Sequence, residues 1–469
     1  MKQIHQAAPA MAIALATWLL PVASLAKHGP SAGLILIPAS AANPQTIAVS
    51  TSLRFHTLAS DFFSEDDGTI YVQTGDIPAM WLRDSSAQTK PYVRFITLHP
   101  KLAPLVRAVI ERNAKNVLTN PYANAFTAGY KIWEEKWEVD SIVYPVSLAY
   151  TYWRRTGNRD LFTPRLHWAL EHTVSTLQCE QQHAQCSHYR SKFLPNGGAG
   201  ARYAQTGMIW GAFRPSDDRV RYPFNIPQQM FAVVGLRELA DLALAGYGDS
   251  KLCNAALRLA DEVSLGIQRH GLVYTRQFGL IYAYEVDGLG HALLADDANL
   301  PNLTAATYYG FAVPTSQVYL NTRRFTLSDA NPYYYRGTYA TGLGSPHSPT
   351  GWVWPLGIIG AALTSALPQD VAHAVDTIEN TNRENSLIHE SFDPDNPDRF
   401  TRAEFGWANA LYAELTFRTA AGFDADPLPS AIAGIDFSAQ RTPVIVAIPQ
   451  IWFNADSINQ ELSDLLQEQ

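Results

Sequence analysis

Apolar residues recur at helical spacing over most of the chain. One stripe runs four, four and three residues apart and consists of Leu166, Leu170, Val174 and Leu177. Residues at this spacing share one face of an α-helix, so the stripe predicts a helix that packs on a core. A second helix is predicted from Pro227 to a stop at Gly246.

A third helix is predicted directly after the second. Its apolar face comprises Leu252, Ala256, Val263 and Ile267, and Gly271 lies beyond its end. Two helices joined by a short glycine-bearing turn form an αα-hairpin. Residues 140–157 show the same pattern, with Asp140 as the predicted N-cap and Gly157 as the stop. Residues 354–367 and 405–421 are further predicted helices, so the fold class is predicted to be all-α.

The segments between these helices combine polar and aromatic residues with Gly, Pro and Asp. They are residues 75–86, 210–218, 296–301, 331–349 and 389–402. Loops on a rigid scaffold are where binding and catalytic residues concentrate. A helical barrel whose site is built from one rim of loops fits this layout, although periodicity alone indicates only a mostly helical fold.

The two ends of the chain differ from the middle. Residues 1–26 begin with Lys2, continue through an apolar stretch at 11–20 and end on small residues before Ala26. This pattern is typical of a signal peptide, and the apolar run is short for a bilayer span, although an uncleaved anchor is the alternative. The interpretation predicts a secreted or periplasmic protein with no stable membrane insertion. Residues 27–425 then form the predicted catalytic domain, and 426–469 form a C-terminal extension whose role the sequence leaves open.

An exported chain meets an oxidising compartment, where cysteines can pair. Cys179 and Cys186 flank a short polar segment and are predicted to close a small loop. Cys253 lies on an apparent helical face and is predicted to be free and buried. The three cysteines lack the spacing of zinc ligands, so no metal is assigned to them.

Composition narrows the possible partners. The chain has a formal net charge of −8 and lacks a long basic run, so nucleic acid is a poor partner and an acidic polymer substrate is disfavoured. Hydrophobic residues make up 47% of the chain, enough for a large core. The 11 Trp and 22 Tyr suit the apolar faces of sugars, although many of them are expected to fill the core.

Adjacent carboxylates mark the most informative loop. Asp217 and Asp218 follow Arg214 in a stretch rich in aromatic residues. Cleavage of a glycosidic bond requires a protonated acid, and a second carboxylate nearby can raise the pKa of an Asp enough to supply one. The alternative is a solvated turn or a helix N-cap, where Asp is common.

Two other stretches carry candidate chemistry. Glu390 lies between His389 and Ser391 and could act as a general base on water, although a surface Glu is the ordinary interpretation. Arg83 and Asp84 could donate to and accept from neighbouring sugar hydroxyls, or form a structural ion pair at a helix start.

Other acidic and histidine residues give weaker signals for metal binding and catalysis. Asp296 and Asp297 lack the spaced acidic pattern of a calcium loop, and His347 alone is more often a structural histidine. The sequence also lacks a Gly-x-Ser-x-Gly elbow, a phosphate-binding loop and a dinucleotide fingerprint.

Six motifs occur in order along the chain. They are Gly75-Asp-Ile-Pro-Ala-Met-Trp-Leu-Arg-Asp-Ser85, Lys136-Trp-Glu-Val-Asp140, Gly211-Ala-Phe-Arg-Pro-Ser-Asp-Asp218, Asp296-Asp-Ala-Asn299, Gly344-Ser-Pro-His347, and His389-Glu-Ser-Phe392 with Phe400-Thr-Arg402. Together they resemble glycoside hydrolase family 125, the exo-acting α-1,6-mannosidases, over about residues 45–420.

The resemblance implies an (α/α)6 barrel, inversion of anomeric configuration, and neither metal nor cofactor. It implies Glu390 as the general base and an acid in the 214–218 loop, where Asp217 is preferred over Asp218. The predicted substrate-binding residues are Arg83, Asp84, Asp140, Arg214, Asp218 and His347. Ala403 and Glu404 depart from the aromatic expected after Arg402, which leaves the linkage preference open.

The implied partner is an α-mannoside oligosaccharide or a glycoprotein glycan, from which single terminal mannose units are removed. Asp217 would protonate the glycosidic oxygen while Glu390 takes a proton from water on the opposite face of the ring. Alternatives are another (α/α)6-barrel glycosidase acting on glucosides such as trehalose, and a non-catalytic glycan-binding protein. A polysaccharide lyase is disfavoured, because the chain lacks a basic groove for uronates.

Overall fold

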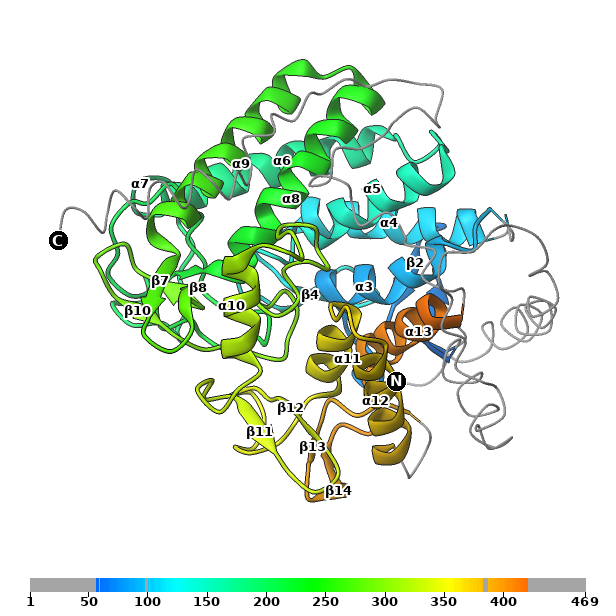
Figure 1. The fold of residues 1–469 in the computed structure, drawn as a ribbon. Coiled ribbons are helices and arrows are strands. Elements are labelled where there is room, and N and C mark those ends of the chain that lie inside the picture. Colours follow the sequence, from blue (N-terminus) through cyan, green and yellow to red (C-terminus); the bar gives the residue numbers. More distant parts are fainter. Residues whose placement is uncertain (1–55, 59, 98–99, 101, 383–386, 421–469) are drawn as a thin grey trace, which may run out of the picture.

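The computed structural model describes residues 56–420, apart from 59, 98–99, 101 and 383–386 (Figure 1). The predicted signal peptide and C-terminal extension lie outside the described residues. The described part is mostly helical, with short antiparallel strands at the ends of the helices.

Within the described residues, five helices form the inner ring of a barrel. They are α3 (Leu82–Val93), α5 (Tyr144–Thr156), α8 (Ile226–Leu242), α11 (Pro355–Leu363) and α13 (Gly406–Ala420). Helix α3 packs between α13 and α5, α5 packs on α8, and α11 packs on α13. Residues 300–312 complete the ring between α8 and α11, where Tyr309 packs on Phe231 and Leu300 lies against Gly360.

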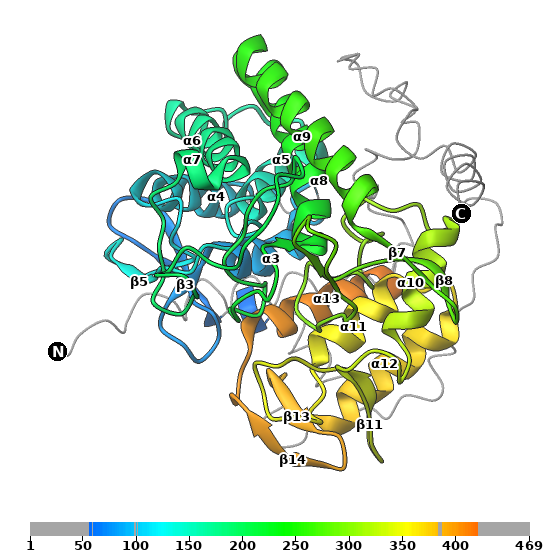
Figure 2. The same ribbon diagram turned by 90° about the vertical axis from the view of Figure 1, so that its left-hand side faces the viewer.

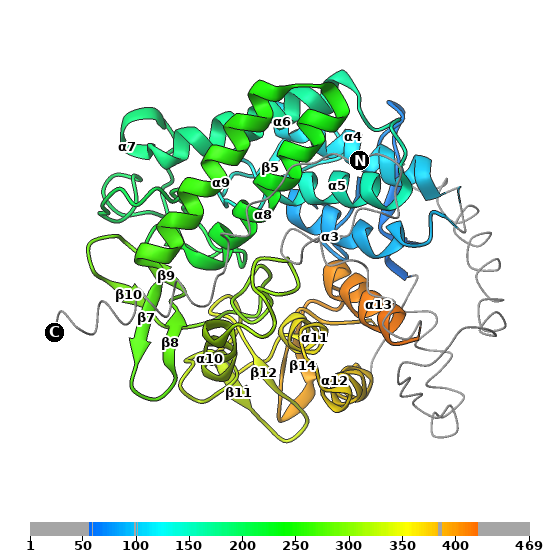
Figure 3. The same ribbon diagram turned by 45° about the horizontal axis from the view of Figure 1, so that its top comes forward.

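The outer ring consists of α4 (Leu102–Thr119), α6 (Pro164–Gln181), α9 (Ser250–His270), α10 (Gln317–Thr326) and α12 (Pro368–Thr381). Helix α4 packs on α3 and α6, α9 packs on α8 and α6, and α12 packs on α11. Figure 3 shows α8 and α9 side by side, as predicted for an αα-hairpin. Among the helices of the described part, none has the length and apolar character needed to cross a membrane.

Local sequence explains where most of these helices begin. Thr163, Asn225 and Asp249 are the N-caps of α6, α8 and α9, and each accepts a hydrogen bond from a backbone N–H of the first turn. The predicted stripe of α6 is buried from Leu166 to Leu177. Glycine ends α5 at Gly157, as predicted.

Two predicted helix ends were wrong. The second helix does not stop at Gly246, because the chain continues through the π-helical turn η2 (Ala243–Tyr247) and ends at Gly248 with φ +67°. Gly246 lies instead against the ring of Phe162, which leaves no room for a side chain. Asp140 is not the N-cap of α5, since the helix follows Val143 and the Asp140 carboxylate bonds to other side chains.

Three of the five polar and aromatic segments, residues 75–86, 331–349 and 389–402, contain short antiparallel strands, and further strands lie elsewhere between the described helices. The strands are β1 (Phe62–Ser64), β2 (Ile70–Val72), β3 (Met80–Trp81), β4 (Ala125–Phe126), β5 (Ile132–Glu134), β6 (Phe224–Asn225), β7 (Leu272–Thr275), β8 (Gly279–Tyr282), β9 (Glu285–Val286), β10 (Ala292–Leu293), β11 (Tyr334–Arg336), β12 (Thr341–Leu343), β13 (Ser391–Asp393) and β14 (Asn396–Thr401). Helical periodicity does not detect such short pairs. Figure 2 shows the β11–β12 and β13–β14 hairpins together at one end of the molecule.

The core is rich in aromatic residues. Trp137, Trp210, Trp354 and Trp407 are buried, which agrees with the expectation that many aromatic residues fill the core. Trp133 and Trp168 are instead about half exposed, at 49% and 56%.

Candidate active site

The candidate site lies where the inner helices begin. Arg83 and Asp84 are in the first turn of α3, Gln228 is in the first turn of α8, and Trp407 is in the first turn of α13. Asp140 lies just before α5, and its carbonyl accepts from the N–H of Tyr144. Helix N-termini carry partial positive charge, so this end of the barrel favours the carboxylates gathered there.

Arg83 links four carboxylates of the site. Its guanidinium donates to Glu138 Oε2 at 2.7 Å and to Asp217 Oδ1 at 3.1 Å, and lies 3.5 Å from Asp140 Oδ2. Its Nε is 3.3 Å from Asp84 Oδ2. The side chain is only 4% exposed and packs over the ring of Trp407. Arg83 therefore organises carboxylates in this structure, beyond the sugar contact predicted from the sequence.

One buried cation cannot balance four ionised carboxylates, so the pKa values of these acids shift. Burial raises the pKa of Asp84 to about 6 against the opposing effect of Arg83. Burial and the neighbouring Asp217 raise the pKa of Glu138 well above its usual range. Burial likewise raises the pKa of Asp140.

Asp217 sits at the tip of a tight turn. Its N–H donates to the carbonyl of Arg214 at 2.9 Å, and Phe213 pairs with Arg219 at the base of the turn. Asp217 has φ +65°, in the left-handed region that Asp tolerates better than most residues. Its side chain is 16% exposed, whereas Glu138 beside it is fully buried. The turn thus presents Asp217 toward the open side of the site.

Asp218 and His347 form the open side of the site. The Nδ1 atom of His347 lies 3.5 Å from Asp218 Oδ2, and the two side chains are 36% and 31% exposed. Its hydrogen bond to Asp218, reinforced by the charge of Asp217, raises the pKa of His347 to about 9 although burial opposes this shift. His347 is also within electrostatic range of Glu390. Asp217 and Glu390, 173 residues apart, therefore share one neighbourhood.

Glu390 directly precedes β13. Its side chain is held by residues at the end of β14, the strand that pairs with β13. Thr401 of β14 donates to Glu390 Oε2 at 3.1 Å, and Arg402 Nη1 lies 3.5 Å from Oε1. Arg402 has φ +50° and also donates to Asp76 at 2.8 Å. These contacts fix the carboxylate while leaving it 12% exposed.

The remaining predicted substrate-binding residues are buried beneath the site. Asp140 accepts from Gln228 at 2.6 Å and is fully buried. Arg214 is ion-paired with Glu285 at 2.5 Å and packs over Tyr284. The structure thus brings all eight predicted residues to one end of the barrel, with Asp217, Asp218, His347 and Glu390 the more exposed of them.

Asp296 and Asp297 bond to protein donors. Asp296 accepts from the N–H groups of Leu303 and Thr304, and burial raises its pKa to about 7. Asp297 accepts from Asn299 and Ser345. Within the described ranges, two groups place three possible ligand atoms within 4.8 Å of one another: His56, Asp61 and Glu404, and His167, Glu171 and Asp249. Neither group includes Asp217 or Glu390.

Sequence reasoning missed several residues that position the site. Glu138, Gln228, Glu285 and Thr401 each bond to a predicted site residue. Glu138 and Thr401 lie inside motifs already noted, so motif membership was the available signal. Gln228 and Glu285 lie outside those motifs, and only the fold brings them to the site.

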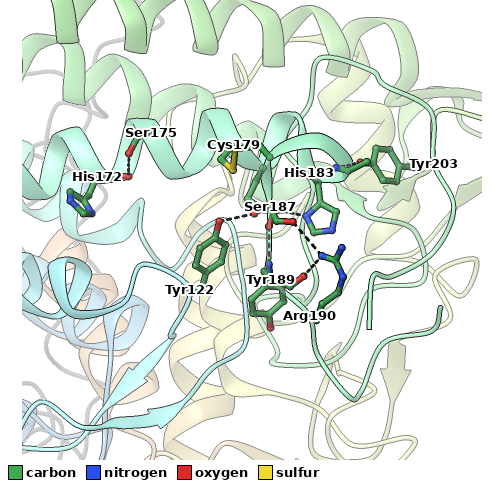
Figure 4. The surroundings of a disulfide bond; sticks show 12 residues. Tyr122, His172, Ser175, Cys179, His183, Ser187, Tyr189, Arg190 and Tyr203 are labelled. Atoms are coloured by element: carbon green, nitrogen blue, oxygen red, sulfur yellow. Dashed lines mark hydrogen bonds and ion pairs between the residues drawn. A yellow bond between two sulfur atoms is a disulfide. The ribbon is translucent and has the colours of Figure 1, made fainter. Parts of the chain in front are cut away.

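The predicted disulfide between Cys179 and Cys186 is confirmed, and Cys253 is free and buried. The bond closes α7 (His183–Cys186) onto the end of α6, as Figure 4 shows. Within this loop Glu180 accepts from Tyr122 at 2.8 Å and lies 2.7 Å from His183. The segment that follows carries Tyr189, which bonds to the backbone at 135 and 137.

A family model described as "Metal-independent alpha-mannosidase (GH125)" matches residues 41–417. The Meiotically up-regulated gene 157 protein of Schizosaccharomyces pombe is 34% identical over 414 residues, which cover 79% of this chain and 79% of that protein.

Solved structures agree in fold. A metal-independent α-mannosidase of Streptococcus pneumoniae, in a non-productive complex with α-1,6-mannobiose, is 36% identical with a TM-score of 0.78, covering 81% of this chain and 94% of that one. A bacterial glucoamylase complexed with acarbose is 14% identical with a TM-score of 0.55, over 80% of this chain and 55% of that one, and shows the fold alone. The (α/α)6 barrel predicted from the sequence is confirmed. The chain is a glycoside hydrolase and belongs to the GH125 family of metal-independent α-mannosidases.

Proposed function

We propose that this enzyme removes single α-1,6-linked mannose units from the non-reducing ends of glycans, with inversion of configuration. Asp217 is the general acid and Glu390 the general base. The observation that carries the proposal is that both carboxyls, far apart in sequence, are partly exposed and lie in the neighbourhood of His347. Two carboxyls on one pocket are the groups that glycoside hydrolysis requires.

The proposed reaction is a single displacement. Asp217 donates a proton to the glycosidic oxygen as the bond between that oxygen and C1 breaks. Glu390 accepts a proton from water as the water oxygen bonds to the opposite face of C1. We expect the two carboxyls to be about 6.5–9.5 Å apart with substrate bound, which leaves room for that water.

Burial beneath the site supports exo action. Arg83, Glu138 and Asp140 are each 4% exposed or less and lie beneath the more exposed Asp217. A glycan chain cannot pass through this buried layer, so we expect the site to accept a terminal ring from its open side. Mannose and the α-1,6 linkage are supported by the 36% identical relative whose structure holds α-1,6-mannobiose.

The test is hydrolysis of defined mannobioses. We expect release of mannose from the α-1,6 isomer to exceed release from the α-1,2 and α-1,3 isomers, and proton NMR should show β-mannose first. Release of the α-anomer first would refute inversion. Equal or faster hydrolysis of glucosides such as trehalose would refute the proposed specificity, and absence of any turnover would indicate a glycan-binding protein.

The catalytic assignments have their own test. Glu390→Gln and Asp217→Asn are each expected to lower kcat on α-1,6-mannobiose by about 100-fold or more, the usual size of an acid–base contribution. Glu404→Gln is the control, because Glu404 lies two residues after Arg402 in the chain but pairs with His56. Near-wild-type turnover of either site variant would remove its residue from the mechanism.

The place of action is a second part of the proposal. We propose that residues 1–26 direct export and that the mature enzyme acts outside the cytoplasm on α-mannoside oligosaccharides or glycoprotein glycans. The disulfide supports this, because such bonds persist in oxidising compartments. N-terminal sequencing of the exported protein should begin at Lys27, and a retained Met1 would refute cleavage.

A further inference from the structure

Glu138 is a buried acid to which the mechanism above gives no role. It lies in the motif 136–140, immediately before α5, and is fully buried. Its Oε2 atom accepts from Arg83 at 2.7 Å and from Ser141 at 2.7 Å. Its Oε1 atom is buried as well and has no donor among the described protein groups. A buried carboxylate oxygen without a donor costs free energy, so the missing partner calls for an explanation.

The side chain that meets Glu138 is Asp217. The same guanidinium holds both, with one Arg83 nitrogen on Glu138 and the other on Asp217 at 3.1 Å. The two carboxyl groups therefore lie next to each other, on the two terminal nitrogens of one guanidinium. Two ionised carboxylates at this distance repel each other in a buried site, so one of them carries a proton.

We propose, on the basis of the function proposed above, that Glu138 and Asp217 share one proton, and that Glu138 is the positioning residue that supplies it to Asp217 for delivery to the glycosidic oxygen. Glu138 is out of reach of a sugar, whereas Asp217 is 16% exposed on the open side. The proton moves from Glu138 to Asp217 and then to the leaving oxygen, as the C1–oxygen bond breaks. Glu390 takes one proton from the attacking water, and the ionised pair regains its proton from solvent.

The surrounding charges agree with this division. Burial raises the pKa of Asp217, but Arg83 and the neighbouring Glu138 outweigh it and lower that pKa. The pKa of Glu138 is raised, so in the free enzyme the proton rests on Glu138. The other groups that face the pair are Lys136, Asp84, Asp140 and His347. Without Glu138, the cations among them would keep Asp217 ionised.

The experiment compares Glu138→Gln with wild type on two substrates. Glutamine keeps the size and can still donate to Asp217, but it cannot release a proton. We expect turnover of α-1,6-mannobiose near pH 7 to fall about 100-fold. Turnover of α-mannosyl fluoride, whose leaving group needs less protonation, should fall less than about 10-fold. The alkaline limb of kcat/KM should move to lower pH by about one unit or more.

Three comparisons keep the result decisive. Ser141→Ala removes the other hydrogen bond to Glu138 but leaves the carboxyl, so its alkaline limb should stay at the wild-type pH. Glu138→Asp keeps a titratable group, so its alkaline limb should lie closer to the wild-type pH than that of Glu138→Gln. This variant also provides the test if Glu138→Gln does not fold. Equal losses on both substrates, or an unmoved pH profile, would overturn the role of Glu138. Full activity of Asp217→Asn would instead overturn the proposed function.

Discussion

His183 lies flat on Trp210, with ring centroids 3.6 Å apart and planes 9° from parallel. His183 belongs to the loop closed by the disulfide, and Trp210 begins the segment that carries Asp217. The backbone carbonyl of Trp210 also accepts a hydrogen bond of 2.9 Å from the indole N–H of Trp137, the residue that precedes Glu138. The disulfide loop therefore braces both segments that supply the acid side of the site.

Removal of the disulfide should lower stability. In the double variant Cys179→Ser, Cys186→Ser we expect the free energy of unfolding to fall by about 2–3 kcal/mol, because the bond closes a short loop and restricts the unfolded chain modestly. Urea unfolding with and without a reducing agent measures this. Cys253→Ala is the control, since it keeps the disulfide and should remain sensitive to reduction. A double variant as stable as oxidised wild type would refute the bracing role.

Loss of Arg83 should destabilise the protein in a pH-dependent way. Arg83→Met leaves three buried carboxylates and the partly exposed Asp217 without their cation, which should cost about 3–5 kcal/mol near neutral pH. Removal of the guanidinium should raise the pKa of all four acids, and the pKa values of Asp84, Glu138 and Asp140 are already raised with Arg83 present. Groups whose pKa is raised on folding contribute stability below their unfolded pKa, near 4, and lose it as the pH rises. For Asp84, whose folded pKa is already about 6, that loss extends past pH 6.

The measurement is the free energy of urea unfolding at about pH 5 and about pH 7.5. The gap between wild type and Arg83→Met should be larger at the higher pH. Arg112→Met is the matched control, since Arg112 is equally buried but donates to Thr69 and to the carbonyl of Thr127. The loss of unfolding free energy in Arg112→Met, relative to wild type, should differ less between the two pH values. Equal pH dependence of the two variants would contradict the carboxylate account.

The sequence predicts the helical scaffold better than the layer beneath the site. Periodic apolar stripes and caps identify α6, α8 and α9, because burial on one helix face leaves a pattern over many residues. The short strands leave no such pattern. The arrangement around Arg83 depends on contacts between α3, the segment before α5 and the turn at Asp217, which only the folded chain brings together.

Motifs therefore locate the site but do not distinguish its layers. In the sequence, Asp140 and Arg214 show the same kind of motif as Asp218 and His347. In the structure, however, Asp140 and Arg214 are buried in ion pairs or hydrogen bonds, whereas Asp218 and His347 are partly exposed. Burial of an individual charged side chain depends on long-range packing. For the same reason the sequence predicts no role for Glu138, although Glu138 lies two residues from Asp140.

The turn at Asp217 should favour glycine over alanine. At φ +65° an alanine side chain is strained, and the left-handed conformation costs an ordinary residue about 1 kcal/mol or more. Asp217→Gly is therefore expected to be more stable to urea than Asp217→Ala by about 1 kcal/mol, since both lack the carboxylate. The same two substitutions at Asp218, whose φ is not positive, form the control. There glycine should not be the more stable variant. A more stable alanine at 217 would show that the turn relaxes.

His347 should make stability depend on pH above neutrality. Its pKa is raised to about 9, chiefly by the hydrogen bond to Asp218, so the folded protein binds a proton that the unfolded chain releases near pH 6.5. This contribution is fully present below about pH 6.5 and is lost as the pH rises to about 9. Its size is modest, because the side chain is 36% exposed and solvent screens the pair. His347→Gln should therefore flatten the wild-type decline in unfolding free energy between these pH values, as measured by urea titration. His172→Gln, a change at an exposed histidine, should keep the wild-type slope. If His347→Gln keeps that slope as well, the proton does not reside on His347.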